Sequence, residues 1–427
     1  MDNPKIEVTK LVDHLFRHET GKLTSVLTRI FGAHHLELAE DVVQDALLEA
    51  IKIWNYQGLP ENPTAWLYKV AKNKALNIVD REKYQKEYSA EVSHFLKSEW
   101  TANAAVENLF FETEIHDDQL RMMFTCCHPS ISGDSQVSLT LKTLCGFSIP
   151  EIARAFLTTD ENINRRLKRA RQTIRENSIA FEVPEGINLE VRLDAVIQTI
   201  YLLFNEGYSA SKGNDLIRYE LCGEAIRLAE LLADSMVIKE KSNVFAILAL
   251  MYLNSSRFQS RQNEKGDIIT MAEQDRTQWD KNLMQKGFYY LDQSTNATIS
   301  VYHVLATISA YHCSAADFES TDWTSILALY DKLLLIDPSP LVMLNRAIAF
   351  AKVNGEKKAI EELKRIEKNP ALQSYHLFHS TLAEFYLQSN LFQEAGSSLK
   401  KAIDLSSLSI EKEWLQKKLE LCLQKIN

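Results

Sequence analysis

The sequence predicts an all-α protein, and three observations support this fold class. The 427 residues include only 13 Gly and 9 Pro, far below the combined share of about 12% in average proteins, so the chain lacks the turns that sandwiches and barrels need. Residues that favour helices, such as Leu, Ala, Glu and Lys, are abundant throughout. Apolar residues recur at helical spacing in several segments. The length indicates two to four domains.

The overall composition predicts a cytoplasmic protein without membrane contact. About 45% of the residues are hydrophobic and 25% charged, as in ordinary globular proteins. The segment that begins at Met1 has no apolar core of a signal peptide, and the longest apolar run, Val244 to Leu253, is too short to span a bilayer. Six cysteines spread from Cys126 to Cys422 suggest reduced thiols and not a disulfide framework.

The first informative segment, Leu36 to Trp54, is predicted to form an amphipathic helix with an acidic stripe. Its apolar residues follow the i, i+3, i+4, i+7 pattern. Glu37, Asp41, Asp45 and Glu49 are spaced four apart on the polar face, where like charges repel one another. Such a stripe suggests docking on a basic partner, although a merely solvated acidic face explains it equally well.

A second helix is predicted to begin at Asn62-Pro63, with Asn as the cap and Pro in the first turn. It carries aromatic, basic and amide side chains: Trp66, Lys69, Asn73, Lys74, Asn77 and Arg81. Basic residues neutralise phosphates, amides read base edges and aromatic rings stack on unpaired bases. This mixture suggests contact with melted DNA, although a single Trp is more often a core residue.

The third segment is a candidate helix-turn-helix. Ser148 to Glu151 has the form of a capping box, the turn is expected at residues 157–159, and Asp160 is expected to cap the second helix. That helix is basic although the whole chain carries a net charge of −9. Its early polar residues would face a major groove and the later basic ones would lie near phosphates: Glu161, Asn162, Asn164, Arg165, Arg166, Lys168, Arg169 and Arg171.

In this order the three segments resemble the bacterial RNA polymerase sigma factors of the extracytoplasmic function (ECF) class, over about residues 11–175. The resemblance implies that the first helix is in region 2 and docks on the β′ subunit of core RNA polymerase, through Glu37, Asp41, Gln44, Asp45 and Glu49. It implies that Trp66 and the polar residues after it read the −10 promoter element, and that the basic helix of region 4 reads the −35 element. Core polymerase (β′ and β) and promoter DNA are the expected partners.

The chain continues for about 250 residues beyond such a minimal sigma factor. Segments around Asn205 and Gln274 resemble those of sigma factors with a helical, tetratricopeptide-like extension. Ala347, Phe350, Ala359 and Leu363 recur as Ala383, Tyr386, Ala395 and Leu399, each 36 residues later, close to the tetratricopeptide period; an unrelated bundle of helical hairpins is the alternative. The expected domains are region 2 (1–90), a linker (91–115), region 4 (116–180), a helical extension (187–315) and the repeats (316–427), which would bind a protein partner or the chain itself.

Other functions explain less of the sequence. We predict no catalytic residues, cofactor or metal, because the common nucleotide-binding and hydrolase motifs are missing. The segments around Glu206 and Arg276 could supply an acid, a base and an anion clamp, but they equally well satisfy a polar core. Adjacent Cys126, Cys127 and His128 make a poor zinc site. The main alternative is a helix-turn-helix regulator with a repeat-based sensor that acts without polymerase. It leaves the acidic stripe and the second basic helix unexplained.

Overall fold

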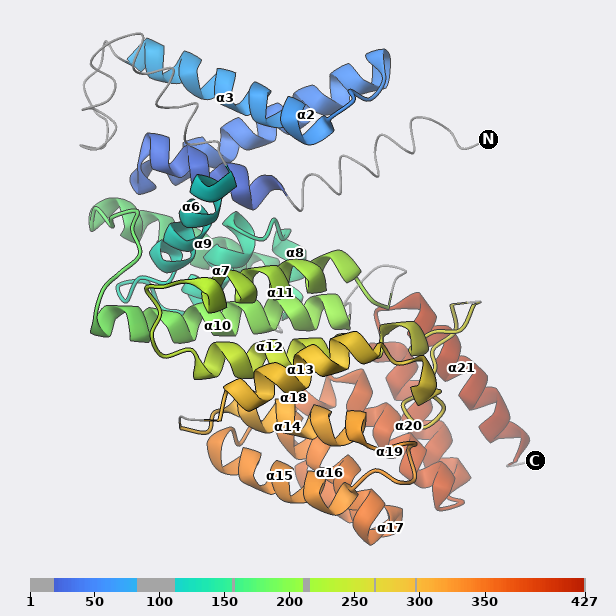
Figure 1. The fold of residues 1–427 in the computed structure, drawn as a ribbon. Helices are drawn as coiled ribbons and strands as arrows, with labels where there is room; N and C mark the ends of the chain where they lie inside the picture. The colour runs from blue at the N-terminus through green and yellow to red at the C-terminus, as the bar shows by residue number, and fades with distance from the viewer. Residues whose placement is uncertain are drawn as a thin grey trace. The chain divides into compact units, whose positions relative to one another are not determined.

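The structure, a computed structural model, is all-α, as the sequence predicts. It describes residues 19–82, 112–155, 158–209, 216–264, 266–295 and 298–425. Within these ranges the chain forms helices and no strand, apart from one isolated antiparallel bridge between Gln262 and Ile268 (Figure 1). None of the described helices is long and apolar enough to cross a membrane.

The chain divides into two compact units. The first contains residues 1–203 and 234–238, and the second contains residues 204–233 and 239–427. The boundary falls inside α10 (Ile187–Tyr208). Each unit is described by itself below.

The first unit opens with helices around one apolar core. Residues 19–31 are helical and are followed by η1 (Ala33–His35), α2 (Leu36–Gln57) and α3 (Pro63–Glu82). The core is built from the apolar stripes of these helices, for example Leu27, Val43 and Leu67. Helix α2 extends three residues beyond its predicted end at Trp54. It stops at Gly58, whose positive φ of 82° favours glycine.

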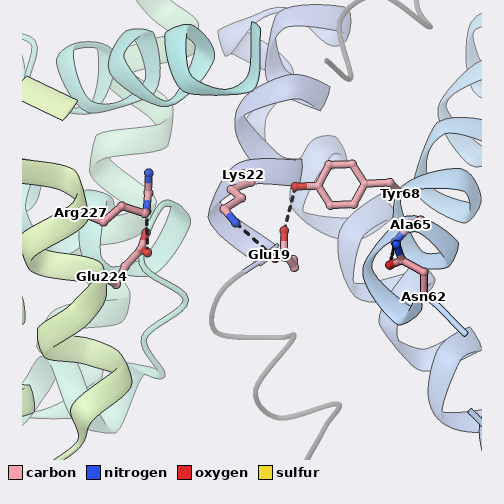
Figure 2. A network of polar contacts seen from close by, with 7 residues as sticks. All are labelled: Glu19, Lys22, Asn62, Ala65, Tyr68, Glu224 and Arg227. Carbon is pink, nitrogen blue, oxygen red and sulfur yellow. Dashed lines mark hydrogen bonds and ion pairs between the residues drawn. The ribbon is translucent and has the colours of Figure 1, made fainter. Parts of the chain in front are cut away.

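Polar contacts fix the start of α3 (Figure 2). Asn62 Oδ1 accepts a hydrogen bond from the Ala65 amide at 3.0 Å, so the predicted cap is confirmed. Tyr68 donates its hydroxyl to Glu19 Oε2 at 2.8 Å, and Lys22 Nζ lies 3.2 Å from the other oxygen of the same carboxylate. These bonds connect α3 to the helix at residues 19–31.

The remaining helices of this unit form a second group. They are α6 (Glu112–Cys126), α7 (Gly133–Thr143), α8 (Ile149–Ala155), α9 (Asp160–Glu176) and the first part of α10. The capping box that opens α8 is confirmed, because the Ser148 amide donates to Glu151 Oε2 at 2.8 Å and the Glu151 amide donates to Ser148 Oγ at 3.4 Å.

The cap of α9 was placed one residue too late. Thr159, and not Asp160, is the capping residue: its backbone is extended and its hydroxyl accepts from the Asn162 amide at 3.3 Å. Asp160 is instead the first helical residue. There its negative charge still stabilises the helix, because it lies at the positive end of the helix dipole. Leu157, the first residue of the expected turn, lies outside the described residues.

In the second unit, the helices that pack most closely on one another are neighbours or next neighbours along the chain. Its helices are the end of α10, α11 (Tyr219–Asp234), α12 (Ser242–Ser255), η2 (Phe258–Ser260), η3 (Arg276–Gln278), α13 (Lys281–Gln293), α14 (Val301–Ser314), α15 (Trp323–Ile336), α16 (Pro340–Asn354), α17 (Glu356–Ile366), α18 (Pro370–Gln373), α19 (His376–Gln388), α20 (Phe392–Leu405) and α21 (Ser409–Gln424). Helix α12 is apolar around most of its surface and is accordingly buried.

The 36-residue repeat corresponds to two helix pairs, α16 with α17 and α19 with α20. Ala347 and Ala383 are buried on the first helix of each pair, and Ala359 and Ala395 are buried on the second. All four lie in one apolar core. Small residues at these equivalent places allow the paired helices to approach closely.

Candidate functional site

The acidic stripe lies on the outer face of α2. Glu37, Gln44, Asp41 and Asp45 are exposed and Glu49 is half-buried, whereas Ala39, Val42, Val43, Ala46 and Leu47 are buried on the opposite side. Asp41 and Asp45 form no ion pair with any described residue. These two carboxylates are therefore free to meet a basic surface.

Helix α3 exposes fewer of the predicted DNA-binding side chains than the sequence suggested. Lys69, Asn73 and Asn77 are exposed and spaced four apart, so they form one line along the helix. Lys74 is half-buried, and its Nζ lies 2.9 Å from Glu49 Oε2 on α2. Arg81 belongs to the last turn of α3, and its side chain lies outside the described part of the structure.

Trp66 packs against the core. Its ring meets the ring of the buried Trp54 edge to face, with centroids 5.2 Å apart, and both lie in one apolar cluster. The half-buried Trp66 side chain thus closes the junction of α2 and α3. This position matches the core role that a lone Trp more often has, and the exposed Lys69, Asn73 and Asn77 are better placed to reach a nucleic acid.

Helix α9 presents a compact basic face. One side of α9 is buried through Ile163, Leu167, Ala170 and Ile174. Arg165, Lys168 and Arg169 are exposed at i, i+3 and i+4, and the structure shows no ion pair of these three with the residues it describes. They form the part of α9 that can neutralise phosphates or read a base edge.

Several of the other predicted region 4 residues have local partners. Asn162 Nδ2 donates to Thr158 Oγ1 at 2.9 Å, and Asn164 Nδ2 donates to the Asp160 carbonyl at 3.1 Å. Arg166 Nη2 lies 2.8 Å from Asp134 Oδ2 at the start of α7. Glu161 is exposed in the first turn.

Two arginines of α9 pair with carboxylates of α2. Arg171 Nη2 lies 2.7 Å from Glu40 Oε2, and Arg175 Nη1 lies 2.9 Å from Glu37 Oε2. The paired residues are 131 and 138 positions apart in the sequence, so no local pattern could reveal them. The predicted polymerase face and the predicted DNA-binding helix therefore share contacts within the first unit.

The cysteines next to His128 are core residues. Cys126 and Cys127 are buried against Thr143 and Thr140 of α7. Burial raises the pKa of the Cys126 thiol to about 12, and it raises the pKa of Cys127 as well. Among the described residues no group of three potential ligands is arranged to hold a metal ion.

In the second unit, Glu206 and Arg276 also make their polar contacts with residues of the same unit. Glu206 is buried and pairs with Arg218 at 3.2 Å. Arg276 donates to the His312 carbonyl at 2.7 Å and to Thr321 Oγ1 at 2.8 Å. These side chains connect segments of the second unit, which is the polar-core role, one of the two roles that the sequence left open for them.

Comparisons with known proteins show which proteins this chain is similar to. Residues 15–84, which include α2 and α3, match the family model of sigma-70 region 2, and residues 192–295 match a family of unknown function, DUF6596. An uncharacterised protein, R00370, of Rhizobium meliloti (strain 1021) is 31% identical over 387 residues, which cover 90% of each chain. The chain belongs to the same family as this protein. No solved structure matches.

The region 2 match over residues 15–84 indicates a general role for this chain. It supports a sigma-factor-like role in transcription initiation, with core RNA polymerase and promoter DNA as partners. The two charged helices described above fall inside the matched residues, whereas α8 and α9 fall outside them.

Proposed function

We propose that this chain is an RNA polymerase sigma factor of the ECF class whose C-terminal helices regulate its activity. In this proposal α2 binds the β′ subunit, α3 opens and reads the −10 element, and α9 reads the −35 element. The chain performs no covalent chemistry, because the polymerase forms the phosphodiester bonds. The observation that carries the proposal is the sigma-70 region 2 match over the residues that form α2 and α3.

The exposure of α2 supports the polymerase contact. Asp41 and Asp45 are exposed on a helix whose other side is fully packed, so they are held rigidly toward solvent. Like-charged residues one turn apart weaken an isolated helix slightly. A basic partner surface would relieve that repulsion and would be attracted over a Debye length of about 8 Å at physiological salt.

Helix α3 exposes the kinds of side chain that bind melted DNA. Lys69 attracts the phosphate backbone, and the amides of Asn73 and Asn77 can donate to and accept from an unpaired base. Because Lys74 is engaged by Glu49, the proposed strand contact centres on this exposed row.

Helix α9 has the kind of shape and the exposed cations that bind duplex DNA. Its capped N-terminus and its short connection from α8 have the form of a helix-turn-helix, in which the second helix enters the major groove. Arg165 near the start of α9 is placed to reach a guanine edge, and Lys168 and Arg169 are placed to reach phosphates.

The second unit is proposed to be a tetratricopeptide-like regulatory extension. The paired helices α16–α17 and α19–α20 and their buried alanines at equivalent positions support a short repeat array. Such arrays bind peptide segments on their concave side, so the extension would hold another part of the chain, the polymerase or a protein partner.

Transcription in vitro tests the proposed function. The full chain is added to core RNA polymerase with a library of fragments from the host genome, and the 5′ ends of the transcripts are sequenced. We expect new 5′ ends preceded by two shared sequence elements near −10 and −35, and their loss with Asp45→Lys. The same transcripts from core polymerase alone would refute the proposal.

A further inference from the structure

Two arginines of the second unit lie against the ring of Trp279. The guanidinium carbon of Arg257 is 5.3 Å from the centre of this ring, and that of Arg276 is 5.1 Å from it. Arg257 follows the end of α12, whereas Arg276 begins η3 and Trp279 directly follows η3. The fold therefore brings two cations from separate segments to one aromatic side chain.

A third arginine adds positive charge at the same place. The guanidinium of Arg261 lies 4.0 Å over the ring of Tyr208 and donates to the Tyr208 carbonyl. Burial lowers the pKa of Arg261, and the nearby Arg257 lowers it further, although Tyr208 opposes the shift. Burial and Arg257 also lower the pKa of Arg276. Arg257 is thus the centre of an arginine cluster that consists of Arg257, Arg261 and Arg276.

Among the described residues no carboxylate lies within ion-pair distance of the arginine cluster. Arg257 is only 9% exposed, and its Nε donates to the neutral side chain of Gln274 at 3.2 Å. Asp317 raises the pKa of Arg276, but this exposed carboxylate accepts from the Ser320 amide at 2.7 Å. Because a buried cation is costly without a counterion, the cluster favours a negatively charged partner.

Neutral acceptors account for only part of Arg276. Its Nη1 donates to the carbonyls of His312 and Ala315 at 2.7 and 3.1 Å, and its Nη2 donates to Thr321 Oγ1 at 2.8 Å. These bonds cap the end of α14 and do not neutralise the charge. The Nε of Arg276 and the Nε1 of Trp279 are buried and meet no hydrogen-bond partner in the described part of the chain. Both are N–H donors, and a buried donor without an acceptor is costly.

We propose that the arginine cluster and Trp279 form a binding site for a phosphate group, either inorganic phosphate or the phosphate of a small molecule. Guanidinium groups bind phosphate through pairs of N–H donors, and the indole N–H supplies a further donor. A phosphate group carries a charge of about −1.5 to −2 near pH 7, so it balances several cations better than one carboxylate does. The site lies within residues 192–295, which match the family of unknown function. It involves no residue of the first unit and is independent of the proposed function.

Calorimetric titration of the full chain measures phosphate binding. The two probes are inorganic phosphate and glycerol 3-phosphate, added at constant ionic strength in a buffer without other oxyanions. Arg257→Gln removes the central charge of the cluster and keeps a polar side chain. Arg346→Gln is the matched control, because it removes an arginine of the same unit that already pairs with Asp331 and Glu362.

We expect the unmodified chain and Arg346→Gln to bind at least one probe equally well, and Arg257→Gln to bind it about tenfold more weakly or less. Tighter binding of glycerol 3-phosphate would assign the site to a phosphate carried by a small molecule, and tighter binding of inorganic phosphate would assign it to the free ion. The proposal is overturned if the folded, unmodified chain binds neither probe, or if Arg257→Gln binds them as the unmodified chain does.

A second variant covers the case in which Arg257→Gln does not fold. Trp279→Phe keeps an aromatic ring beside the guanidinium groups of Arg257 and Arg276 and lacks the indole N–H. We expect this variant to bind the same probe about tenfold more weakly, and the probe to raise its urea midpoint less than that of the unmodified chain. Binding by Trp279→Phe as tight as that of the unmodified chain would overturn the assigned site.

Discussion

Lys74 of α3 lies 2.9 Å from Glu49 of α2, and this ion pair joins two helices to which the sequence assigned separate roles. One residue of the proposed −10 set therefore neutralises one residue of the proposed polymerase set. The same two helices also meet where the rings of Trp54 and Trp66 pack together. Of the two predicted sets, Glu37, Asp41, Gln44 and Asp45 are exposed on α2, and Lys69, Asn73 and Asn77 are exposed on α3.

Substitutions in α9 should separate DNA contact from structure. Arg165→Ala and Lys168→Ala remove exposed cations, so we expect weaker −35 binding, by about 1–3 kcal/mol where a base edge is read by two hydrogen bonds. Each lost phosphate contact should also reduce the slope of log K against log salt by about 0.9. Titration of a promoter duplex at several salt concentrations measures both effects.

Arg166→Ala is the matched control on the same helix. Its guanidinium pairs with Asp134 of α7, so this variant should lose stability against urea and keep the salt slope. A salt slope that falls as much for Arg166→Ala as for Lys168→Ala would contradict the assignment of the exposed face.

Substitutions in α3 should affect promoter opening. Asn73→Ala and Asn77→Ala remove exposed amides without disturbing the core, so we expect slower open-complex formation and unchanged polymerase binding. Permanganate footprinting of unpaired thymines measures the opening, and co-elution measures the binding. Loss of polymerase binding in either variant would count against the proposed role of α3.

Removal of the C-terminal helices should reduce transcription. We propose that the extension is needed for activity, on the basis of its size and the short stretch that precedes α10. The truncation should follow Tyr208 and retain α10, because Arg192 in that helix donates to the Phe124 carbonyl of α6 at 3.3 Å. Transcript yield from one promoter, with the truncated and full chains at equal occupancy of polymerase, is the measurement; undiminished yield would refute the need for the extension.

The second unit should become less stable in mild acid because of His312. Burial, with Arg257 and Arg276 nearby, lowers the pKa of this histidine to about 3 from its ordinary 6.5. Between these values the unfolded chain binds a proton that the folded chain does not, so stability falls as the pH falls. From pH 7 to pH 5 the loss is about 2 kcal/mol.

His312→Phe isolates this effect, because phenylalanine retains a ring beside Trp323 and cannot titrate. Urea unfolding at pH 7 and pH 5 should show a loss about 2 kcal/mol smaller in the variant. An equal loss of stability in both proteins would contradict this account, because it would mean that His312 takes up a proton at pH 5 in the folded chain as it does in the unfolded chain.

The sequence predicted those features that depend on local patterns. Helical spacing located α2, α3 and α9, and the caps at Asn62 and Ser148 were correct because capping depends on residues within one turn. The cap of α9 was misplaced because Thr159 and Asp160 are both good caps and only the backbone angles distinguish them.

The features that escaped prediction depend on tertiary contacts. Nothing near Arg171 in the sequence indicates that its partner is Glu40, and nothing near Gly21 indicates the backbone of Leu144. Trp66 could be a stacking platform or a core residue until Trp54 is seen beside it. The surface residues that remain available for binding therefore emerge only from the structure.

The most direct test of the account is whether the purified chain forms a complex with core RNA polymerase. The two are mixed and passed over a size-exclusion column, with Asp41→Lys/Asp45→Lys compared against Asp292→Lys, which reverses an exposed carboxylate on α13. We predict co-elution that the first variant loses and the second retains. A full chain that does not co-elute but binds duplex DNA tightly by itself would contradict the sigma-factor account and favour a regulator that acts without polymerase.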